Sequence, residues 1–277
     1  AFSDRTGIRM KFFFLFFLPI SLTAFVINPW FPKIAEFKFR PDYSYRYYPS
    51  INNGFNPSKY NSHDQLIDTN LGVRFLPNWE AQIEIDFANT RCLSWGTQRI
   101  GSQIRYLVLD DIEGDSISLV LGGQAFYVPR RNMRDVSSPY HSVGNMELNI
   151  AIGKEFSQID RWLYRYYGFF GLGIGSKGYP WVRPVLSFEW KHNYNKKIQL
   201  FSEGYFGLGG TKKVNIDQFD GYGKIQHASI DLGLNYTYLF RIWGSIGFEY
   251  KYRIYASSFP QQVSIFRVQY CLPFSIF

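Results

Sequence analysis

The sequence predicts an all-β fold, and three observations lead to that prediction. Apolar and polar residues alternate with a period of two along about a dozen segments of the chain. The connections between these segments are short and long in turn, and aromatic side chains, 20% of the residues, gather near the segment ends. Because successive side chains of a β-strand point to opposite faces, each segment has one apolar and one polar face.

The mean hydropathy narrows the class of protein. Its value of -0.19 is that of an ordinary soluble protein, whereas a helical membrane protein needs roughly 20 consecutive apolar residues for each span. A membrane β-barrel has no such requirement, because only alternate residues of each strand face lipid. The 277 residues allow one large all-β domain or two smaller ones. Length therefore leaves both a soluble β fold and a membrane barrel open.

The beginning of the chain has the pattern of a secretory signal peptide. Met10 and Lys11 precede an apolar run from Phe12 to Leu18, and the small residue Ala24 follows. The wider apolar run from Phe12 to Ile27 is short for a membrane span and Pro19 interrupts it, so we expect a cleaved peptide rather than a permanent anchor. The expected organisation is an N-terminal extension plus signal peptide over residues 1–24, a periplasmic lead-in over 25–34 and a transmembrane β-barrel over 35–277.

Alternating runs fill the chain from residue 35 onward. One of the clearest has Ile83, Ile85 and Phe87 on one face and Glu84 and Asp86 on the other. Strands with this pattern bury one face and leave the other in a different solvent. We expect about twelve strands, at residues 37–47, 70–75, 80–87, 99–108, 117–124, 145–155, 164–174, 182–191, 197–208, 229–240, 241–255 and 263–277.

The connections between these runs are alternately short and long along the chain. Short ones lie at residues 76–78, 111–115, 157–160, 193–195 and 240–241, and longer polar ones at 49–62, 89–94, 129–141, 176–180, 209–223 and 257–262. An up-and-down barrel has this arrangement when one end carries periplasmic turns and the other extracellular loops. A soluble sandwich with Greek-key connections has no reason to sort its loops. The sequence therefore predicts a transmembrane up-and-down antiparallel β-barrel of about twelve strands, with ten or fourteen as alternatives.

The end of the chain adds a family resemblance. With its signal-like start, its number of strands and its terminal Phe277, the mature chain resembles Gram-negative, porin-like outer-membrane β-barrels over almost its whole length. The resemblance implies location in the cell outer membrane, contact with lipid and lipopolysaccharide, and recognition by the barrel-assembly machinery, for which Phe277 is the candidate signal. Alternate positions before Phe277 carry Ser275, Pro273 and Cys271 rather than apolar residues. A bulge near Pro273 would restore the family's pattern.

The polar faces of the strands carry charges of both signs, which a barrel would turn toward its lumen. Barrels of about eight strands are filled by side chains and those of sixteen or more enclose open channels, so twelve strands predict a narrow, charged lumen. The expected lumen-lining residues are Arg74, Glu84, Asp86, Arg99, Arg105, Glu147, Arg165, Arg183, Glu189, Lys191, Glu203, Asp231, Glu249, Lys251, Arg253 and Arg267.

Two functions fit such a lumen. A narrow passive channel would admit small hydrophilic solutes, and its basic residues would favour anions. Alternatively, the charges pair into a network that plugs the barrel, which then acts as a non-conducting structural or adhesive protein through its outer loops. The oligomeric state is open in both.

A third hypothesis is a lipid hydrolase. His227 and Ser229 resemble the His-x-Ser pair of outer-membrane phospholipases and lipid A deacylases, in which the histidine acts as the base for a serine nucleophile. Parity places both side chains in the lumen, away from lipid. Ile230 and Asp231 replace the Asn and Gly that follow the serine in the phospholipase motif. We therefore expect no enzymatic activity and no catalytic residue.

Other partners find little support in the sequence. The formal charge of +8 could indicate nucleic-acid binding, but no cluster of Lys and Arg is longer than a pair such as Arg130-Arg131. A basic surface facing anionic lipid or lipopolysaccharide explains the charge as well. Cys92 and Cys271 are too few for a disulfide framework and are not spaced as metal ligands. We expect no nucleic-acid partner, no metal and no cofactor.

Overall fold

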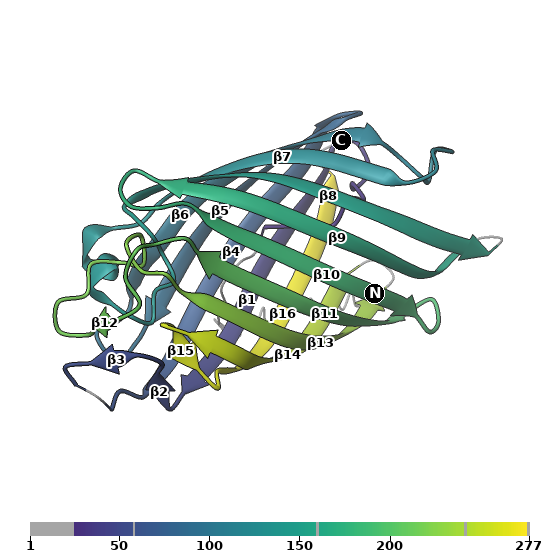
Figure 1. Cartoon of the computed structure of the whole chain (residues 1–277). Coiled ribbons are helices and arrows are strands. Elements are labelled where there is room, and N and C mark those ends of the chain that lie inside the picture. The colour runs from purple at the N-terminus through teal and green to yellow at the C-terminus, as the bar shows by residue number, and fades with distance from the viewer. Residues whose placement is uncertain (1–24, 58, 159–160, 241–242, 276–277) are drawn as a thin grey trace, which may run out of the picture.

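The computed structural model describes residues 25–57, 59–158, 161–240 and 243–275. The predicted signal peptide over residues 1–24 and the predicted assembly signal Phe277 lie outside these ranges. Within them, twelve antiparallel strands form a closed barrel (Figure 1). The barrel strands are β1 (Glu36–Tyr48), β4 (Ser62–Leu76), β5 (Trp79–Asn89), β6 (Gly96–Leu109), β7 (Ser118–Tyr127), β8 (Gly144–Gln158), β9 (Arg161–Gly175), β10 (Trp181–Lys191), β11 (Lys196–Gly207), β13 (Ala228–Phe240), β14 (Gly244–Ser257) and β16 (Ser264–Ser275).

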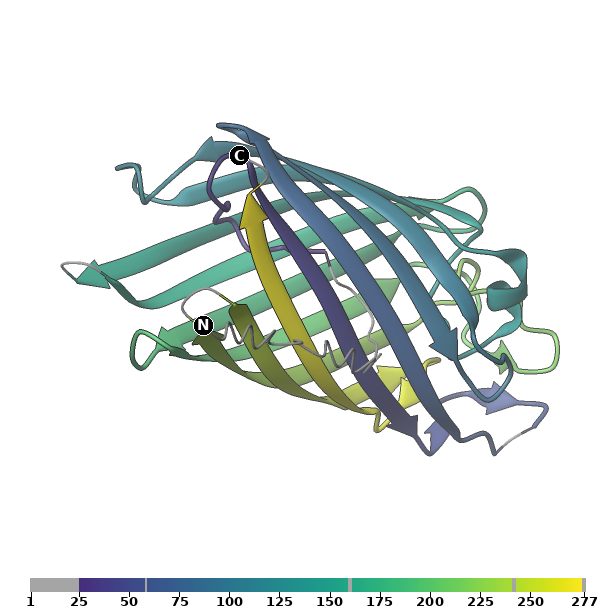
Figure 2. The same ribbon diagram turned by 180° about the vertical axis from the view of Figure 1, so that it is seen from behind.

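The topology is that of an up-and-down barrel. Each barrel strand pairs with the next barrel strand along the chain, and β1 pairs with β16 to close the wall (Figure 2). Closure removes the free edges that an open sheet would leave unpaired. The predicted fold class and the predicted number of strands are confirmed.

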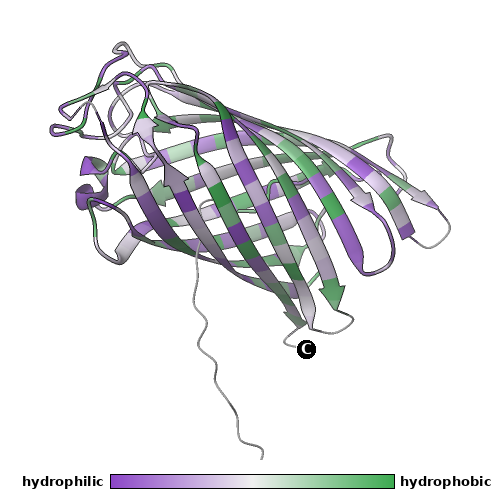
Figure 3. Ribbon diagram, turned by 90° about the horizontal axis from the view of Figure 1, so that it is seen from below, coloured by the Kyte–Doolittle hydropathy of each residue, from purple (hydrophilic) through white to green (hydrophobic). Residues whose placement is uncertain are grey.

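The alternation of the sequence sets the two faces of the wall. In β5 the polar side chains of Glu80, Gln82 and Glu84 are buried, while Ile83 and Ile85 are exposed. This is the reverse of a soluble protein, in which charged side chains are rarely buried. The apolar face therefore looks outward, and Figure 3 shows the resulting alternation of hydrophobic and hydrophilic residues along the strands.

The outer wall forms an apolar belt. Leu148 is 70% exposed and Leu186 is 68% exposed, near the middle of their strands. Aromatic rings pair across neighbouring strands nearer the ends, as Trp79 does with Tyr106 at 4.8 Å between ring centroids. Aliphatic residues at mid-height with aromatic girdles at the rims are typical of a barrel surrounded by lipid. No helix among the described residues is long and apolar enough to cross a membrane.

The two ends of the barrel differ. One end, here the short-turn end, carries brief connections such as residues 77–78 and 192–195 together with the start of β1 and the end of β16. The other, the loop end, carries the longest connections, such as residues 128–143 and 208–227, where the sequence predicts long loops. These contain four short strands and one 3-10 turn: β2 (Ser50–Ile51), β3 (Gly54–Phe55), η1 (Arg130–Arg134), β12 (Val214–Asn215) and β15 (Pro260–Gln261).

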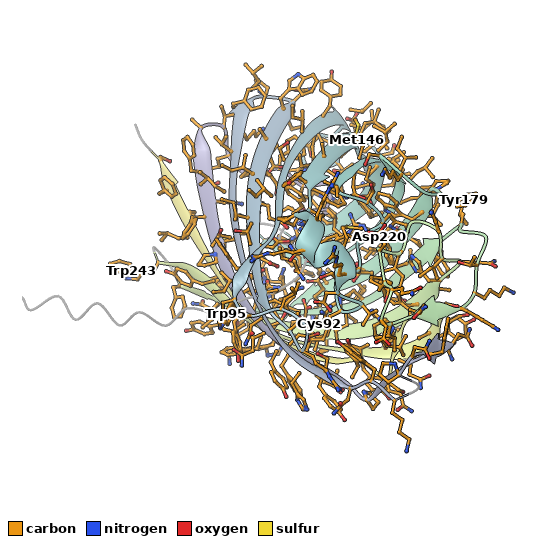
Figure 4. The ribbon with its side chains drawn as sticks, turned by 90° about the vertical axis from the view of Figure 1, so that its left-hand side faces the viewer. Cys92, Trp95, Met146, Tyr179, Asp220 and Trp243 are labelled. Atoms are coloured by element: carbon orange, nitrogen blue, oxygen red, sulfur yellow. The ribbon has the colours of Figure 1, made fainter. Side chains whose placement is uncertain are left out.

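Loops far apart in sequence pack together over the loop end. We call this layer the cap; it comprises residues 49–57, 59–61, 128–143, 208–227 and 258–263. Strand β3 pairs with β12 and β2 pairs with β15, and Figure 4 shows the cap lying across the barrel mouth. The cap and the adjoining strand ends share an apolar core of Tyr48, Ile51, Tyr60, Val136, Val214, Ile216, Phe219, Tyr222, Ile225, Phe259, Val263 and Ile265.

The closing strand differs from expectation at Pro273. The β1–β16 register runs without a shift from Phe39 opposite Leu272 to Glu36 opposite Ser275. The described part of β16 therefore has no bulge at Pro273, which pairs directly with Lys38. A proline lacks the backbone N–H, but near the end of a strand the loss affects a single position of the ladder.

Candidate functional site

Charged side chains from all parts of the barrel wall meet in the interior. The alternation places the following residues on the inner face: Arg74 of β4, Glu84 and Asp86 of β5, Arg99 and Arg105 of β6, Glu147 of β8, Arg165 of β9, Arg183, Glu189 and Lys191 of β10, Glu203 of β11, Asp231 of β13, Glu249, Lys251 and Arg253 of β14, and Arg267 of β16. Ile85, between Glu84 and Asp86, points outward.

One series of ion pairs crosses five strands. Arg183 lies 2.8 Å from Glu147 and 4.0 Å from Glu203, and Lys251 lies 2.8 Å from Glu203 and 3.9 Å from Asp231. The series ends where Asp231 accepts from Arg253 at 2.7 Å. We call these six residues the charge ladder. Buried charges at such distances hold each other in place, because losing one partner leaves the other uncompensated.

Other ion pairs line the rest of the wall. Near the short-turn end, Glu189 accepts from Arg165 at 2.5 Å and from Lys197 at 3.1 Å. On the opposite wall Arg99 pairs with Asp86 at 2.7 Å, and Arg105 donates from Nε to Glu80 at 2.9 Å. Most of the predicted lumen charges therefore lie beside an opposite charge on an adjoining strand or on the next strand but one.

Two basic residues of β1 resemble Arg74, whose hydrogen bonds in the described structure go to backbone carbonyls rather than to a carboxylate. Lys38 and Arg40 lie two positions apart on the inner face of β1, both half-buried. Arg40 donates to Asn70 Oδ1 at 3.2 Å, and among the described residues neither cation forms an ion pair with a carboxylate. The sequence analysis missed them as site residues. Their alternation with Phe37 and Phe39 is the signal that could have identified them.

The segment before β1 runs inside the barrel. The backbone N–H of Val26 donates to Gln82 Oε1 at 3.0 Å, Arg105 donates to the carbonyl of Asn28 at 2.5 Å, and Trp30 Nε1 donates to Asp111 Oδ1 at 3.1 Å. Figure 2 shows this dark purple stretch turning from β1 into the barrel. The expected lead-in over residues 25–34 is thus placed in the lumen, a difference that follows from its contacts with the inner wall.

Apolar and cationic groups hold this lumen segment. Ile27 and Phe31 pack on a buried apolar patch formed by Leu107, Val120, Ala151, Phe169 and Val185. The guanidinium carbon of Arg165 lies 4.3 Å from the Trp30 ring centroid, and that of Arg105 lies 4.8 Å from the Phe31 ring centroid. Cation–π contacts of this kind are stronger where water is excluded. The segment therefore fills the side of the lumen next to β6–β10.

Two cavities remain beside the lumen segment. The inner cavity, about 390 Å³, extends from the short-turn end and is lined by the segment together with residues of β1, β5, β9–β11, β13, β14 and β16. The outer cavity, about 120 Å³, lies beneath the cap. Both cavities are lined by Phe25 and by three members of the charge ladder, Arg183, Glu203 and Lys251. These shared residues therefore form a charged layer between the two cavities.

The structure does not assemble His227 and Ser229 as a catalytic pair. Both side chains are buried, but His227 Nε2 lies 3.1 Å from His141 Nε2, and no hydrogen bond joins His227 to Ser229 among the described residues. A base must lie within hydrogen-bond reach of the nucleophile that it activates. The geometry instead joins His227 to a second histidine that the sequence analysis did not single out.

The remaining candidate groups form no site of their own. Within the described ranges, no three His, Cys, Asp or Glu side chains are grouped as metal ligands. Cys92 and Cys271 are both free. In the cap, burial raises the pKa of Asp135, whose Oδ1 accepts from the backbone N–H of Ser137 at 2.9 Å.

Sequence comparison and structural comparison give different results. No protein-family model and no curated protein matches the chain. Among solved structures, an outer-membrane channel from Pseudomonas putida F1 is similar, with a TM-score of 0.64 at 10% identity over 88% of this chain and 97% of that one. A NanC porin structure has a TM-score of 0.55 at 9% identity, over 84% and 98% of the two chains.

At such low identities the likeness concerns the fold. The shared fold and the exposed apolar belt together confirm the prediction of a β-barrel of the outer-membrane type.

Proposed function

We propose that this outer-membrane barrel is a narrow passive channel for small hydrophilic solutes, with a preference for anions. One observation carries the proposal: Arg183, Glu203 and Lys251 line both the inner and the outer cavity, so a solute moving from the short-turn end to the underside of the cap would cross only this charged layer. A solute on this route exchanges part of its hydration for fixed charges of both signs. The loop end would face the outside, and residues 1–24 would be removed as a signal peptide.

The lining of the inner cavity supports the preference for anions. Its acidic residues are Asp42, Glu80, Glu189, Glu203 and Glu249, and its basic residues are Lys38, Arg40, Arg165, Arg183, Lys197, Lys251 and Arg267. Most of these cations are balanced by the ion pairs described above, whereas Lys38 and Arg40 are not paired with a carboxylate in the described structure. They would supply the excess positive potential that attracts an anion.

We further propose that the chain performs no covalent chemistry and needs no cofactor. Its other contacts would be with lipid along the apolar belt and with anionic lipopolysaccharide near exposed Arg130, Arg131 and Arg134 at the loop end. The barrel-assembly machinery would act on the chain before closure, with Phe277 as its signal.

A non-conducting barrel is the second candidate, because the apolar core of the cap covers the loop end. Single-channel recording on the refolded protein in a planar bilayer separates the two functions. A channel gives discrete conductance steps that grow with KCl concentration. Absence of steps at every salt concentration, with the barrel verified as folded by its resistance to SDS, would favour a structural or adhesive role.

Replacing Lys38 and Arg40 by Glu is expected to turn the preference from anions toward cations. A unit charge about 8 Å from the ion path interacts with an ion by about 0.5 kcal/mol in water, so each reversal should change the anion-to-cation permeability ratio by about fivefold or more. The reversal potential in a KCl gradient measures this ratio.

Lys38→Glu and Arg40→Glu are also made singly, and the matched control for each is Lys59→Glu, which reverses one charge at an exposed cap residue. It should leave the reversal potential near that of the parent chain. Equal shifts in a single variant and in the control would mean that overall charge, rather than the lumen pair, sets the preference.

A further inference from the structure

Two buried histidines meet where two loops of the cap join the barrel. His141 lies near the end of loop 128–143 and His227 is the last residue of loop 208–227. Their Nε2 atoms are 3.1 Å apart, and the residues are only 3% and 2% exposed. Trp181 stacks on His141 with 4.4 Å between ring centroids, and Phe259 stacks on His227 at 4.8 Å. The pair is therefore enclosed by aromatic rings.

The hydrogen bonds around the pair place a single proton between the two Nε2 atoms. The hydroxyl of Tyr205 lies 3.0 Å from the carbonyl of Pro139 and 3.0 Å from His141 Nδ1. If this hydroxyl donates to Pro139, His141 Nδ1–H donates to Tyr205, and His227 Nε2–H donates to His141 Nε2. His227 Nδ1 then has no hydrogen-bond partner in the described structure. Among the possible tautomers, this arrangement leaves no N–H of the pair without an acceptor.

An additional proton has no acceptor at either ring. On His141 Nε2 it would set two N–H groups against each other across 3.1 Å. On His227 Nδ1 it would create a buried N–H with no partner. Either position also places a charge among apolar rings, which is unfavourable without a counter-ion. The observed geometry is therefore compatible only with two neutral imidazoles.

The groups around the pair do not compensate a positive charge. Tyr205 of β11 and Tyr222 of the cap contact the histidine rings edge-on, and the Tyr222 hydroxyl donates to the carbonyl of Val136 at 2.8 Å. The charged side chain that acts on His227 is Arg253 of β14, which pairs with Asp231 at 2.7 Å. Within the described ranges no carboxylate forms an ion pair with either histidine. Burial lowers the pKa of His141 to about 3. Burial is the largest cause that lowers the pKa of His227, and the neighbouring His141 and Arg253 lower it further.

The pair lies beside residues that line the outer cavity. Pro139 and Tyr140, just before His141, line that cavity together with Tyr205 and Phe259, both of which contact the histidine rings. The two loops are also joined by the bond from the Tyr222 backbone N–H to the Tyr140 carbonyl, at 2.9 Å. Separating the histidines would pull apart the loops that roof the cavity.

We propose that the His141–His227 contact is an acid-sensitive latch, and that its protonation opens the cap and widens the outer mouth of the barrel. In the open cap both rings meet water and bind protons with their ordinary affinity. In the closed cap they do not. The latch therefore stabilises the closed cap fully above a pH of about 6.5, and this stabilisation is lost as the pH falls below that value. Each unit of pH below it favours the open cap by about tenfold for each histidine, down to the pKa of the closed form.

The first test measures conductance as a function of pH. Because this inference rests on the proposed channel function, steps at pH 7.5 must be recorded first. The parent chain should show a larger conductance or open probability when the cap side is brought from pH 7.5 to 4.5, and the His141→Gln/His227→Gln variant should not respond. His63→Gln and His192→Gln alter exposed histidines outside the latch and should respond like the parent. A response that persists in the double variant, or a parent that does not respond, overturns the latch.

A second measurement needs no ion flow, so it fails independently of the channel function. Hydrogen–deuterium exchange of residues 208–227 is compared at pH 4.5 between the parent and the double variant, which cancels the intrinsic effect of pH. The loop of the parent should exchange at least about tenfold faster than that of the double variant. The upper bound is larger, because two pH units below 6.5 favour the open cap by roughly a hundredfold for each histidine. Equal exchange rates contradict the latch.

Asp135→Asn tests the competing trigger in the same cap, because burial raises the pKa of that carboxyl. This variant should keep the acid response of the parent. If the acid response disappears in Asp135→Asn and remains in the histidine variant, the trigger is the carboxyl and the latch is excluded.

Discussion

Deleting residues 25–34, so that residue 24 joins residue 35, is expected to increase the single-channel conductance. The lumen segment fills the side of the barrel next to β6–β10, where Ile27 and Phe31 cover an apolar patch of the wall. Without it, the inner cavity would extend across the whole section of the barrel. Because the current through a water-filled barrel grows with its open section, a rise of about two- to threefold is expected.

A milder variant separates the blocking role of the segment from its role in assembly. Trp30→Ala/Phe31→Ala keeps the chain length but removes the rings that contact Arg165 and Arg105. It should give a noisier current with excursions to the larger level, as the segment leaves the wall and returns. Conductance equal to that of the parent in both variants would show that the segment does not limit flow.

Replacing Glu80 by Gln is expected to lower the free energy of unfolding by about 3–5 kcal/mol, because it leaves a buried guanidinium without its carboxylate. Glu80 and Arg105 are each 1% exposed. Arg105 also donates to the carbonyl of Asn28 at 2.5 Å. The loss should therefore loosen the lumen segment as well. Urea titration in lipid vesicles, followed by tryptophan fluorescence, measures the change.

Two further variants identify the cause. Glu113→Gln removes an exposed carboxylate from a turn and should change the unfolding free energy by less than about 0.5 kcal/mol. Glu80→Gln/Arg105→Met removes both charges and should recover most of the lost stability. If the double variant is as unstable as the single one, the uncompensated cation is not the cause.

The strands could be predicted because the signal is local and repeated. In β5 each isoleucine on the lipid face stands between two polar residues of the lumen face, and the same relation recurs in the other strands. The alternation along each strand then identified the residues of the inner face, among them Arg99 and Arg267. Which carboxylate pairs with which cation depends on the register between strands, and that is a property of the closed barrel rather than of any one segment.

The contents of the lumen could not be predicted in this way. Phe25, Ile27 and Phe31 continue the apolar composition of the preceding segment, so nothing local marks them as a lumen segment. The cations that contact the rings of Phe25, Phe31 and Trp30 lie far along the chain, at Arg99, Arg105 and Arg165. His141 was missed for a related reason, because a loop has no periodicity from which its contact with His227 could be inferred.

The pairing of β3 with β12 bears on the order in which the molecule assembles. Gly54 and Phe55 lie beside Val214 and Asn215, residues brought together only after most of the strands between them are in place. Contacts of such high sequence separation form late, because the entropy of closing the intervening chain is lost before any contact is gained. The cap is therefore expected to fold after the barrel has closed and to open before it unfolds, as a separate cooperative unit.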